Sequence, residues 1–364
     1  MKAIKFSVAA AAALALATVA SADGLTAYGQ VSGEVGSYFD KGANTNKIGV
    51  HSYASRFGLK GAADVGGGLT AVYQLEAGFN GVNGANSIPG AAEQDAGSIT
   101  PSNGNNQLAS RNTFAGVAGG FGTFVIGNHD TPYKIVARGS GAITSADTVA
   151  DLHLNTDRRL QGAVAYIAPA DALGGVTLAV AVVPVKDVNG SQDNSGFHYS
   201  VGALIPAGDL ATIGVGYESA YVPALDDSIT SIFAGAGFNF DAIKVGVAVE
   251  QVTAGDKLGK DLGTTAVLVP FSITLDDGLY VNAGVKYTKF DKGGAAQLTG
   301  LPGDIVDADN NVLQVSASVG KKWAKTLDLY AGAKLTQAKN EVIGSGTGKK
   351  KSATDFGVGL KVAF

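Results

Sequence analysis

Apolar and polar positions alternate along most of the chain with a period of two residues. In residues 25–35 the odd positions are apolar or small. The even positions there are Thr26, Tyr28, Gln30, Ser32 and Glu34. A period of two is typical of a β-strand with one apolar and one polar face. Residues 23–364 show no segment with the period of about 3.6 that an amphipathic helix requires, so the pattern predicts an all-β chain.

The alternating segments number 16 and run from one end of the chain to the other. They start near Leu25, Arg56, Leu69, Arg111, Thr123, Arg159, Val176, Gly196, Leu210, Ser228, Ile243, Thr265, Leu279, Val312, Thr326 and Ala353. Short turns alternate with long polar links. The long links are residues 38–51, 80–109, 129–156, 186–195, 253–264, 291–309 and 340–352. Outer-membrane barrels are connected in this way, with short periplasmic turns and long outer loops.

The last segment indicates which face of the strands meets lipid. Large apolar residues occupy its even positions, Phe356, Val358, Leu360, Val362 and Phe364. Taken alone, the segment fits equally a lipid-facing strand and the last strand of a soluble sandwich. However, about 16 strands enclose a water-filled lumen, and lipid requires a closed sheet with an even strand number. We therefore expect a 16-stranded antiparallel transmembrane β-barrel, with these residues facing lipid, Lys361 facing the lumen, and the strand closing against residues 25–35.

Residues 1–22 have the features of a secretory signal peptide. Lys2 and Lys5 precede an apolar run over residues 6–20, and Ala20-Ser21-Ala22 fits the small-residue cleavage rule. We expect a single barrel domain over residues 23–364, located in the outer membrane. Removing two lysines changes the formal charge from −4 to 25 − 31 = −6, and this acidity argues against a nucleic-acid partner.

The chain shows no convincing chemistry of catalysis or cofactor binding. The four histidines have no metal-ligand spacing. The glycine- and lysine-rich residues 346–352 have the wrong glycine spacing for a phosphate loop, and no predicted helix follows them. The residue types of Asn128-His129-Asp130 occur in hydrolase sites, but such a site needs a convergence that sequence cannot show. We expect no enzyme activity, no metal and no cofactor.

Several segments together resemble the strands of Gram-negative general porins. These are residues 55–61 (SRFGLKG), 68–76 (GLTAVYQLE), 111–117 (RNTFAGV), 120–127 (GFGTFVIG), 159–166 (RLQGAVAY) and the terminal Phe364. The resemblance spans the chain and is dense in its first half. It implies a homotrimer of 16-stranded barrels in the outer membrane, in contact with lipid and lipopolysaccharide, through which small polar solutes and ions diffuse passively. It also implies that the barrel-assembly machinery reads Phe364 as an assembly signal.

The resemblance further implies that the third loop, about residues 129–156, folds into the lumen and narrows it. Its acidic residues would be Asp130, Asp147 and Asp151. The basic side of the constriction would be formed by Arg56, Lys60, Arg111 and Arg159. One departure is Asn128, where the family often has arginine, and it weakens any transfer of ion selectivity.

Three functions stay open from the sequence: a general diffusion porin, a substrate-selective channel with an internal binding ladder, and a barrel that acts as an adhesin or hydrolase. The sequence leaves pore size, ion selectivity and the natural substrate undetermined. It also leaves open whether residues 80–109 or 291–309 latch onto a neighbouring subunit.

Overall fold

A computed structural model describes residues 25–40, 45–79, 111–143, 148–156, 158–186, 195–223, 226–255, 263–291, 311–324, 326–339 and 352–364. Strands make up most of this part of the chain. They are β1 (Thr26–Asp40), β2 (Thr45–His51), β3 (Arg56–Gly66), β4 (Leu69–Gly78), β5 (Thr113–Gly119), β6 (Gly122–Asp130), β7 (Arg159–Ile167), β8 (Thr177–Lys186), β9 (Ser195–Ala207), β10 (Ala211–Val222), β11 (Asp227–Phe240), β12 (Ile243–Ala254), β13 (Gly263–Thr274), β14 (Leu279–Phe290), β15 (Asn311–Trp323), β16 (Leu327–Ala338) and β17 (Ser352–Ala363).

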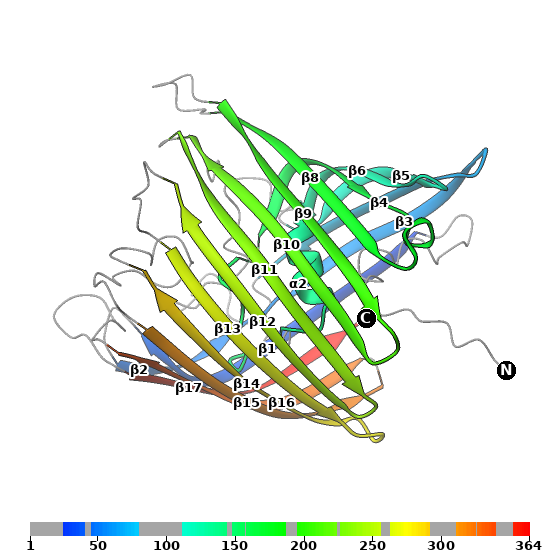
Figure 1. The fold of residues 1–364 in the computed structure, drawn as a ribbon. Coiled ribbons are helices and arrows are strands. Elements are labelled where there is room, and N and C mark those ends of the chain that lie inside the picture. Colours follow the sequence, from blue (N-terminus) through cyan, green and yellow to red (C-terminus); the bar gives the residue numbers. More distant parts are fainter. Residues whose placement is uncertain are drawn as a thin grey trace.

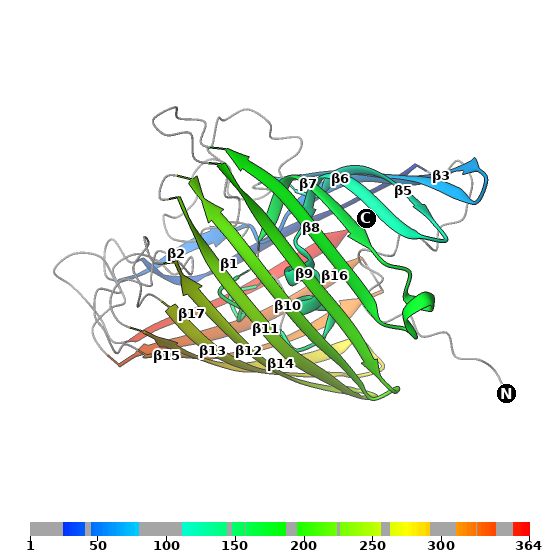
Figure 2. The same ribbon diagram turned by 45° about the horizontal axis from the view of Figure 1, so that its top comes forward.

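These strand segments form one closed antiparallel sheet (Figures 1 and 2). From β3 onward each strand pairs with the next along the chain, and β17 pairs with β1, where Val358 lies opposite Val35. Both β2 and β3 pair with β1, so together they form one barrel strand. The 17 described segments therefore make 16 barrel strands, and each of the 16 predicted segments coincides with one of them.

The first long link departs from the prediction. Residues 38–51 were expected to form a polar loop, but β1 continues to Asp40 and residues 45–51 form β2. In this hairpin Glu34 lies opposite His51 and Tyr38 lies opposite Lys47. The strand is interrupted at residues 52–55, where the side chain of Ser32 on β1 bonds the backbone carbonyl of Tyr53. The polar residues that suggested a loop are therefore strand residues that pair with β1.

The two faces of the sheet are as the alternation predicts. On β17, Phe356 is 55% exposed and Val358 is 64% exposed, whereas Gly357 and Gly359, which alternate with them, are buried on the inner face. The other strands likewise turn large apolar side chains outward, which suits a barrel whose outer surface meets lipid. Inside, buried polar residues such as Glu34 and Glu250 point away from that surface.

Helices are few in the described residues. A short helix, α2 (Pro132–Gly139), and a 3₁₀ turn, η2 (Ala170–Leu173), interrupt the strands. The expectation that no amphipathic helix exists was wrong for α2, which buries Tyr133, Val136 and Ala137 along one side. None of the helices in these residues combines the length and the apolar character that crossing a membrane as a helix would demand.

Candidate functional site

Between β6 and β7 the chain leaves the wall and enters the barrel, as predicted. We call residues 131–158 the inward loop, of which residues 144–147 and 157 lie outside the described part. Helix α2 begins the loop, because Thr131 Oγ1 accepts the N–H of Lys134 at 3.1 Å and Pro132 occupies the first helical position. The helix packs against the inner faces of β9 and β10 (Figure 1).

Glycines on the wall let the backbone of the inward loop lie directly against the sheet. A Cβ at Gly202 would lie 2.6 Å from the carbonyl oxygen of Pro132, and one at Gly214 would lie 2.7 Å from that of Val136. Non-bonded atoms do not approach so closely, so any side chain at these positions would push the loop into the lumen. We call this surface the glycine bed. Its members are Gly202, Gly214, Gly216, Gly235, Gly237 and Gly246.

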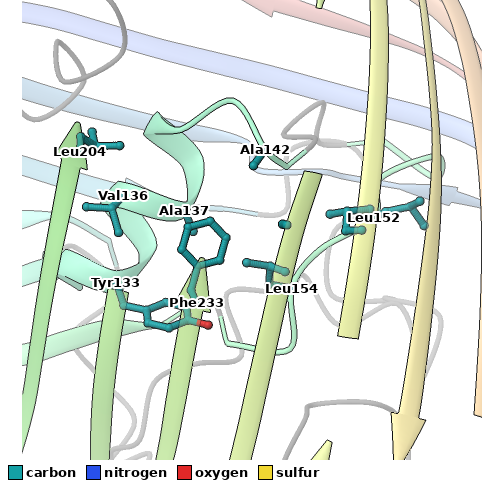
Figure 3. Close-up of a cluster of buried hydrophobic side chains, with 10 residues drawn as sticks. Tyr133, Val136, Ala137, Ala142, Leu152, Leu154, Leu204 and Phe233 are labelled. Carbon is teal, nitrogen blue, oxygen red and sulfur yellow. The ribbon is translucent and has the colours of Figure 1, made fainter. Parts of the chain in front are cut away.

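A hydrophobic cluster holds the same loop in place. Figure 3 shows apolar side chains of the loop lying over side chains from several strands of the wall. The loop supplies Tyr133, Val136, Ala137, Ala142, Leu152 and Leu154, and the wall supplies Leu204, Phe233, Ala248 and Leu268. Tyr133 and Phe233 meet edge to face with ring centroids 5.9 Å apart. Each large apolar side chain buried here contributes about 1.5–3 kcal/mol, so the loop is part of the protein core.

Glu250 on β12 is the main polar anchor of the loop. It is wholly buried and accepts three hydrogen bonds: from the Tyr133 hydroxyl at 2.7 Å, from the Asn155 N–H at 2.5 Å and from the Thr156 N–H at 2.9 Å. Burial, together with the charge of Glu250, raises the pKa of Tyr133 well above its ordinary value. The hydroxyl therefore keeps its proton and acts as the donor, and both ends of the loop meet at one carboxylate.

Two further buried glutamates hold other parts of the loop. Glu34 on β1 accepts the N–H of Val149 at 3.1 Å and the hydroxyl of Tyr38 at 2.8 Å. Glu218 on β10 lies 3.3 Å from Arg158 Nη1, where the loop returns to the wall. Both glutamates are 0% exposed. The sequence places them only on polar strand faces, and nothing in it distinguishes an anchoring glutamate from a solvated one.

Lys286 on β14 completes the attachment. Its ammonium donates to the carbonyl oxygen of His153 at 2.6 Å and to Asn155 Oδ1 at 2.8 Å, and the residue is 3% exposed. The inward loop is therefore tied to β10, β12, β14 and β1. It covers one side of the lumen. The opposite wall, formed by β3 to β5, stays uncovered.

The uncovered wall carries two of the predicted arginines. Arg111 Nε lies 2.6 Å from Glu76 Oε1, and Arg56 Nε lies 3.8 Å from Glu76 Oε2. The hydroxyl of Tyr28 donates to the same carboxylate at 2.8 Å. The structure thus brings Arg56 and Arg111 together around Glu76 on β4, to which the sequence assigned no role. We call Arg56, Arg111 and Glu76 the arginine wall.

Asp130 does not face the arginines across the lumen. It ends β6 opposite Arg159 on β7, and the two side chains form an ion pair at 3.0 Å. Lys134 lies 3.2 Å from the same carboxylate, and Asn112 accepts from Arg159 Nε at 2.8 Å. The expectation of an acidic loop side at Asp130 was therefore wrong, because this residue still belongs to the wall and the loop begins after it.

The other predicted site residues lie in different surroundings. Asp151 is buried within the inward loop, 3.6 Å from His153 Nε2, and Asp147 lies outside the described residues. Lys60 faces the lumen on the same strand as Arg56, nearer to the short turn, and its ammonium lies 5.3 Å from the centre of the Tyr28 ring. Phe364 lies on the outer surface beside Gly29. Within the described residues, no group of three potential metal-binding side chains comes together.

Comparisons with known proteins agree with this geometry. A family model described as Gram-negative porin matches residues 9–341. The chain is similar to the major outer membrane protein P.IB of Neisseria lactamica, with 27% identity over 96% of this chain and 97% of the relative. Among solved structures it is similar to the anion-selective porin from Comamonas acidovorans, with a TM-score of 0.69, 20% identity, and coverage of 94% and 99%. It is also similar to OmpT of Vibrio cholerae in its trimer form, with a TM-score of 0.62, 17% identity, and coverage of 94% and 100%.

Proposed function

Since the chain belongs to the Gram-negative porin family, it is an outer-membrane channel for passive diffusion of small solutes, and we propose that the inward loop and the arginine wall set its selectivity. The observation that carries the proposal is their arrangement. The loop covers the lumen side of β9 to β14 and reaches β1, and the arginines lie on the wall that it leaves open. Solutes pass between a fixed backbone and a charged surface.

The charges on the open side support a weak preference for anions. Two arginines and one glutamate leave the arginine wall with a net charge of 2 − 1 = +1. The neighbouring group of Arg159, Lys134 and Asp130 also sums to 2 − 1 = +1. In a narrow aqueous passage with low-dielectric walls, a positive potential raises the local anion concentration. The similar Comamonas porin is named as anion-selective, which agrees with this reading.

We expect replacement of Arg56 and Arg111 by alanine to shift the permeability from anions toward cations. The double variant changes the net charge of the arginine wall from +1 to −1, and we expect the chloride-to-potassium permeability ratio to fall roughly twofold or more. The reversal potential across a planar bilayer in a KCl gradient measures this ratio. Glu76→Gln is the matched control, because it removes the opposite charge at the same place and should raise the ratio. An unchanged ratio in both variants would show that selectivity is set elsewhere.

The proposal extends to assembly as a homotrimer. The outer face carries a broad band of exposed apolar side chains, and a similar porin is described in a trimer form. We expect a heat-modifiable trimer that resists SDS at room temperature and migrates as a monomer after boiling, which gel electrophoresis detects. Migration as a monomer before heating, from native membranes and at every detergent concentration, would contradict it. Signal-peptide removal before Asp23 and contact with lipopolysaccharide are parts of the same proposal.

The porin family and the fold are those of a non-enzymatic channel. Single-channel recording in planar bilayers tests the proposal as a whole. Open general diffusion predicts ohmic conductance that grows with salt and does not saturate. The alternative of a substrate-selective channel predicts saturation or block by one solute. A purified trimer that inserts but conducts nothing would exclude both and favour a barrel with another role.

A further inference from the structure

Within the described residues, the lumen contains three copies of one local arrangement that involves a tyrosine, a glycine and a lysine. In each copy the tyrosine lies beside a glycine on the next barrel strand, and a lysine two residues after that glycine stands over the tyrosine ring. We call these the Tyr–Gly–Lys units. They are Tyr28 with Gly58 and Lys60, Tyr280 with Gly320 and Lys322, and Tyr330 with Gly359 and Lys361.

The register of the sheet makes the three units alike. Tyr28 is directly opposite Gly58, Tyr280 opposite Gly320, and Tyr330 opposite Gly359. The hydroxyl end of each ring lies directly over its glycine: a Cβ at Gly58 would lie 2.5 Å from Tyr28 Cζ, and one at Gly359 would lie 2.5 Å from Tyr330 Cζ. A side chain on the glycine would therefore displace the ring.

The three lysines lie at nearly the same distance from their tyrosine rings and in the same direction along their strands. Their ammonium groups lie 5.3, 5.3 and 5.5 Å from the ring centres, for Lys60, Lys322 and Lys361 in that order. This is within the range in which a cation is attracted to the face of an aromatic ring. In every unit the tyrosine is on the earlier strand and the lysine lies toward the short-turn end. The arrangement therefore fixes where three flexible charges stand.

The units occupy one continuous arc of the lumen wall. They are built on β14–β15, β16–β17 and β1–β3, and these strands follow one another in the closed sheet. Alternation places the lysines inside, because Leu59 and Leu360 beside them are exposed on the outer face. All three lysines lie toward the short-turn end, beyond the level at which Glu34 holds the inward loop on β1.

These lysines differ electrostatically from the arginines of the constriction. Within the described part of the chain, none of the three ammonium groups has a carboxylate oxygen within 4.0 Å. Asp328 is opposite Lys361 on one side and Lys322 on the other, and its Oδ1 accepts the hydroxyl of Tyr280 at 2.9 Å. The arginines share Glu76, whereas the lysines present positive charge to the water of the lumen.

We propose that Lys60, Lys322 and Lys361 form a binding track for small anions with carboxylate or phosphate groups, on the short-turn side of the constriction. The proposal rests on the channel function and adds a second, independent element of selectivity to it. An ammonium held on a ring by cation–π attraction is positioned yet keeps open donors toward the lumen. Each lysine then offers a site at which the free energy of the anion is lower than in bulk water. A solute anion can pass from one of these sites to the next along the arc.

The test compares the triple variant K60Q/K322Q/K361Q with the wild-type channel in planar bilayers, using chloride and inorganic phosphate as probes. We expect the anion-to-cation permeability ratio to fall roughly twofold or more at about 0.1 M salt and to change little at about 1 M, where the screening length is only about 3 Å. The corresponding triple arginine variant should restore the ratio, because a guanidinium also stacks on a ring face.

Lys244→Gln is the control, and it is compared with each single lysine substitution. Lys244 lies on the lumen side of β12, opposite Asn239 and Ser272, and it has no tyrosine beneath it in the described residues. A fall in the ratio that is confined to the three unit lysines supports the track. An unchanged ratio in the triple variant at low salt, or an equal fall with Lys244→Gln, overturns it. Failure of the channel function itself would appear differently, as absent conductance in the wild-type protein.

Discussion

Replacing Glu250 by alanine is expected to release the inward loop from the wall and to give a channel with higher and noisier conductance. The reason is that three buried donors converge on this carboxylate: the Tyr133 hydroxyl and the N–H groups of Asn155 and Thr156. A buried donor that loses its acceptor costs about 1–3 kcal/mol. The three together amount to ~3–9 kcal/mol before the loop relaxes, which is comparable with the stability of a small domain.

Relaxation of the loop determines the outcome of this substitution. Asn155 links Glu250 to Lys286, because its N–H donates to the glutamate and its Oδ1 accepts from the lysine. Loss of Glu250 therefore weakens a second attachment of the loop as well. The barrel strands keep their own backbone pairing, so we expect the wall to stay folded while the loop moves within the lumen. Single-channel conductance, open-channel noise and thermal unfolding of the trimer measure the effect.

Glu250→Gln is the matched control for this prediction. It keeps the volume of the side chain and one acceptor oxygen, but its amide group meets N–H donors. We expect an effect between wild type and alanine in all three measurements. Identical conductance, noise and thermal stability in the alanine variant would show that the hydrophobic cluster and the other polar attachments hold the loop without Glu250.

Deleting Phe364 should reduce the amount of barrel that reaches the outer membrane while leaving the conductance of the inserted channels unchanged. The residue closes the sheet at its seam. Its N–H donates to the Gly29 carbonyl at 3.1 Å, and its own carbonyl accepts the Gly29 N–H at 3.0 Å. The ring covers Gly29 so closely that a Cβ there would collide with it. The deletion removes both bonds and the aromatic ring that covers Gly29.

The control for the deletion is Phe356→Ala. Phe356 lies on the same strand and the same outer face, and it is 55% exposed, so the substitution also removes one lipid-facing ring. We propose that Phe364 acts as an assembly signal, and on that basis the deletion should lower membrane levels severalfold more than the control, as seen by immunoblotting of outer-membrane fractions. Equal levels in the two variants would mean that Phe364 is only one more apolar contact.

Much of the barrel could be predicted from the alternation alone. A period of two reports which face of a strand is apolar, and this information is present in every strand separately. The beginnings of the 16 strands followed from it, as did the outward direction of Phe356 and the inward direction of Lys361. It did not reveal β2, because this strand is short and begins with the polar residues Thr45, Asn46 and Lys47, which resemble those of a loop.

The site could be predicted only in outline. Arg56 and Arg111 were identified, but Glu76 between them was not, because the pairing depends on the register of three strands. Helix α2 spans eight residues, about two turns, which is too short for a helical period to be distinguished in sequence. The anchoring role of Glu250 depends on residues about a hundred positions away, with which it shares no sequence pattern.

The distant attachments of the inward loop also constrain how the channel is made. Tyr133 and Glu250 are separated by 117 positions, and Glu34 and Val149 by 115. Contacts between such distant residues form late, since neighbouring hairpins close much faster. The loop therefore has no wall to bind until the strands from β9 to β14 are in place. We therefore expect folding to pass through a wide barrel, with the narrow passage formed last.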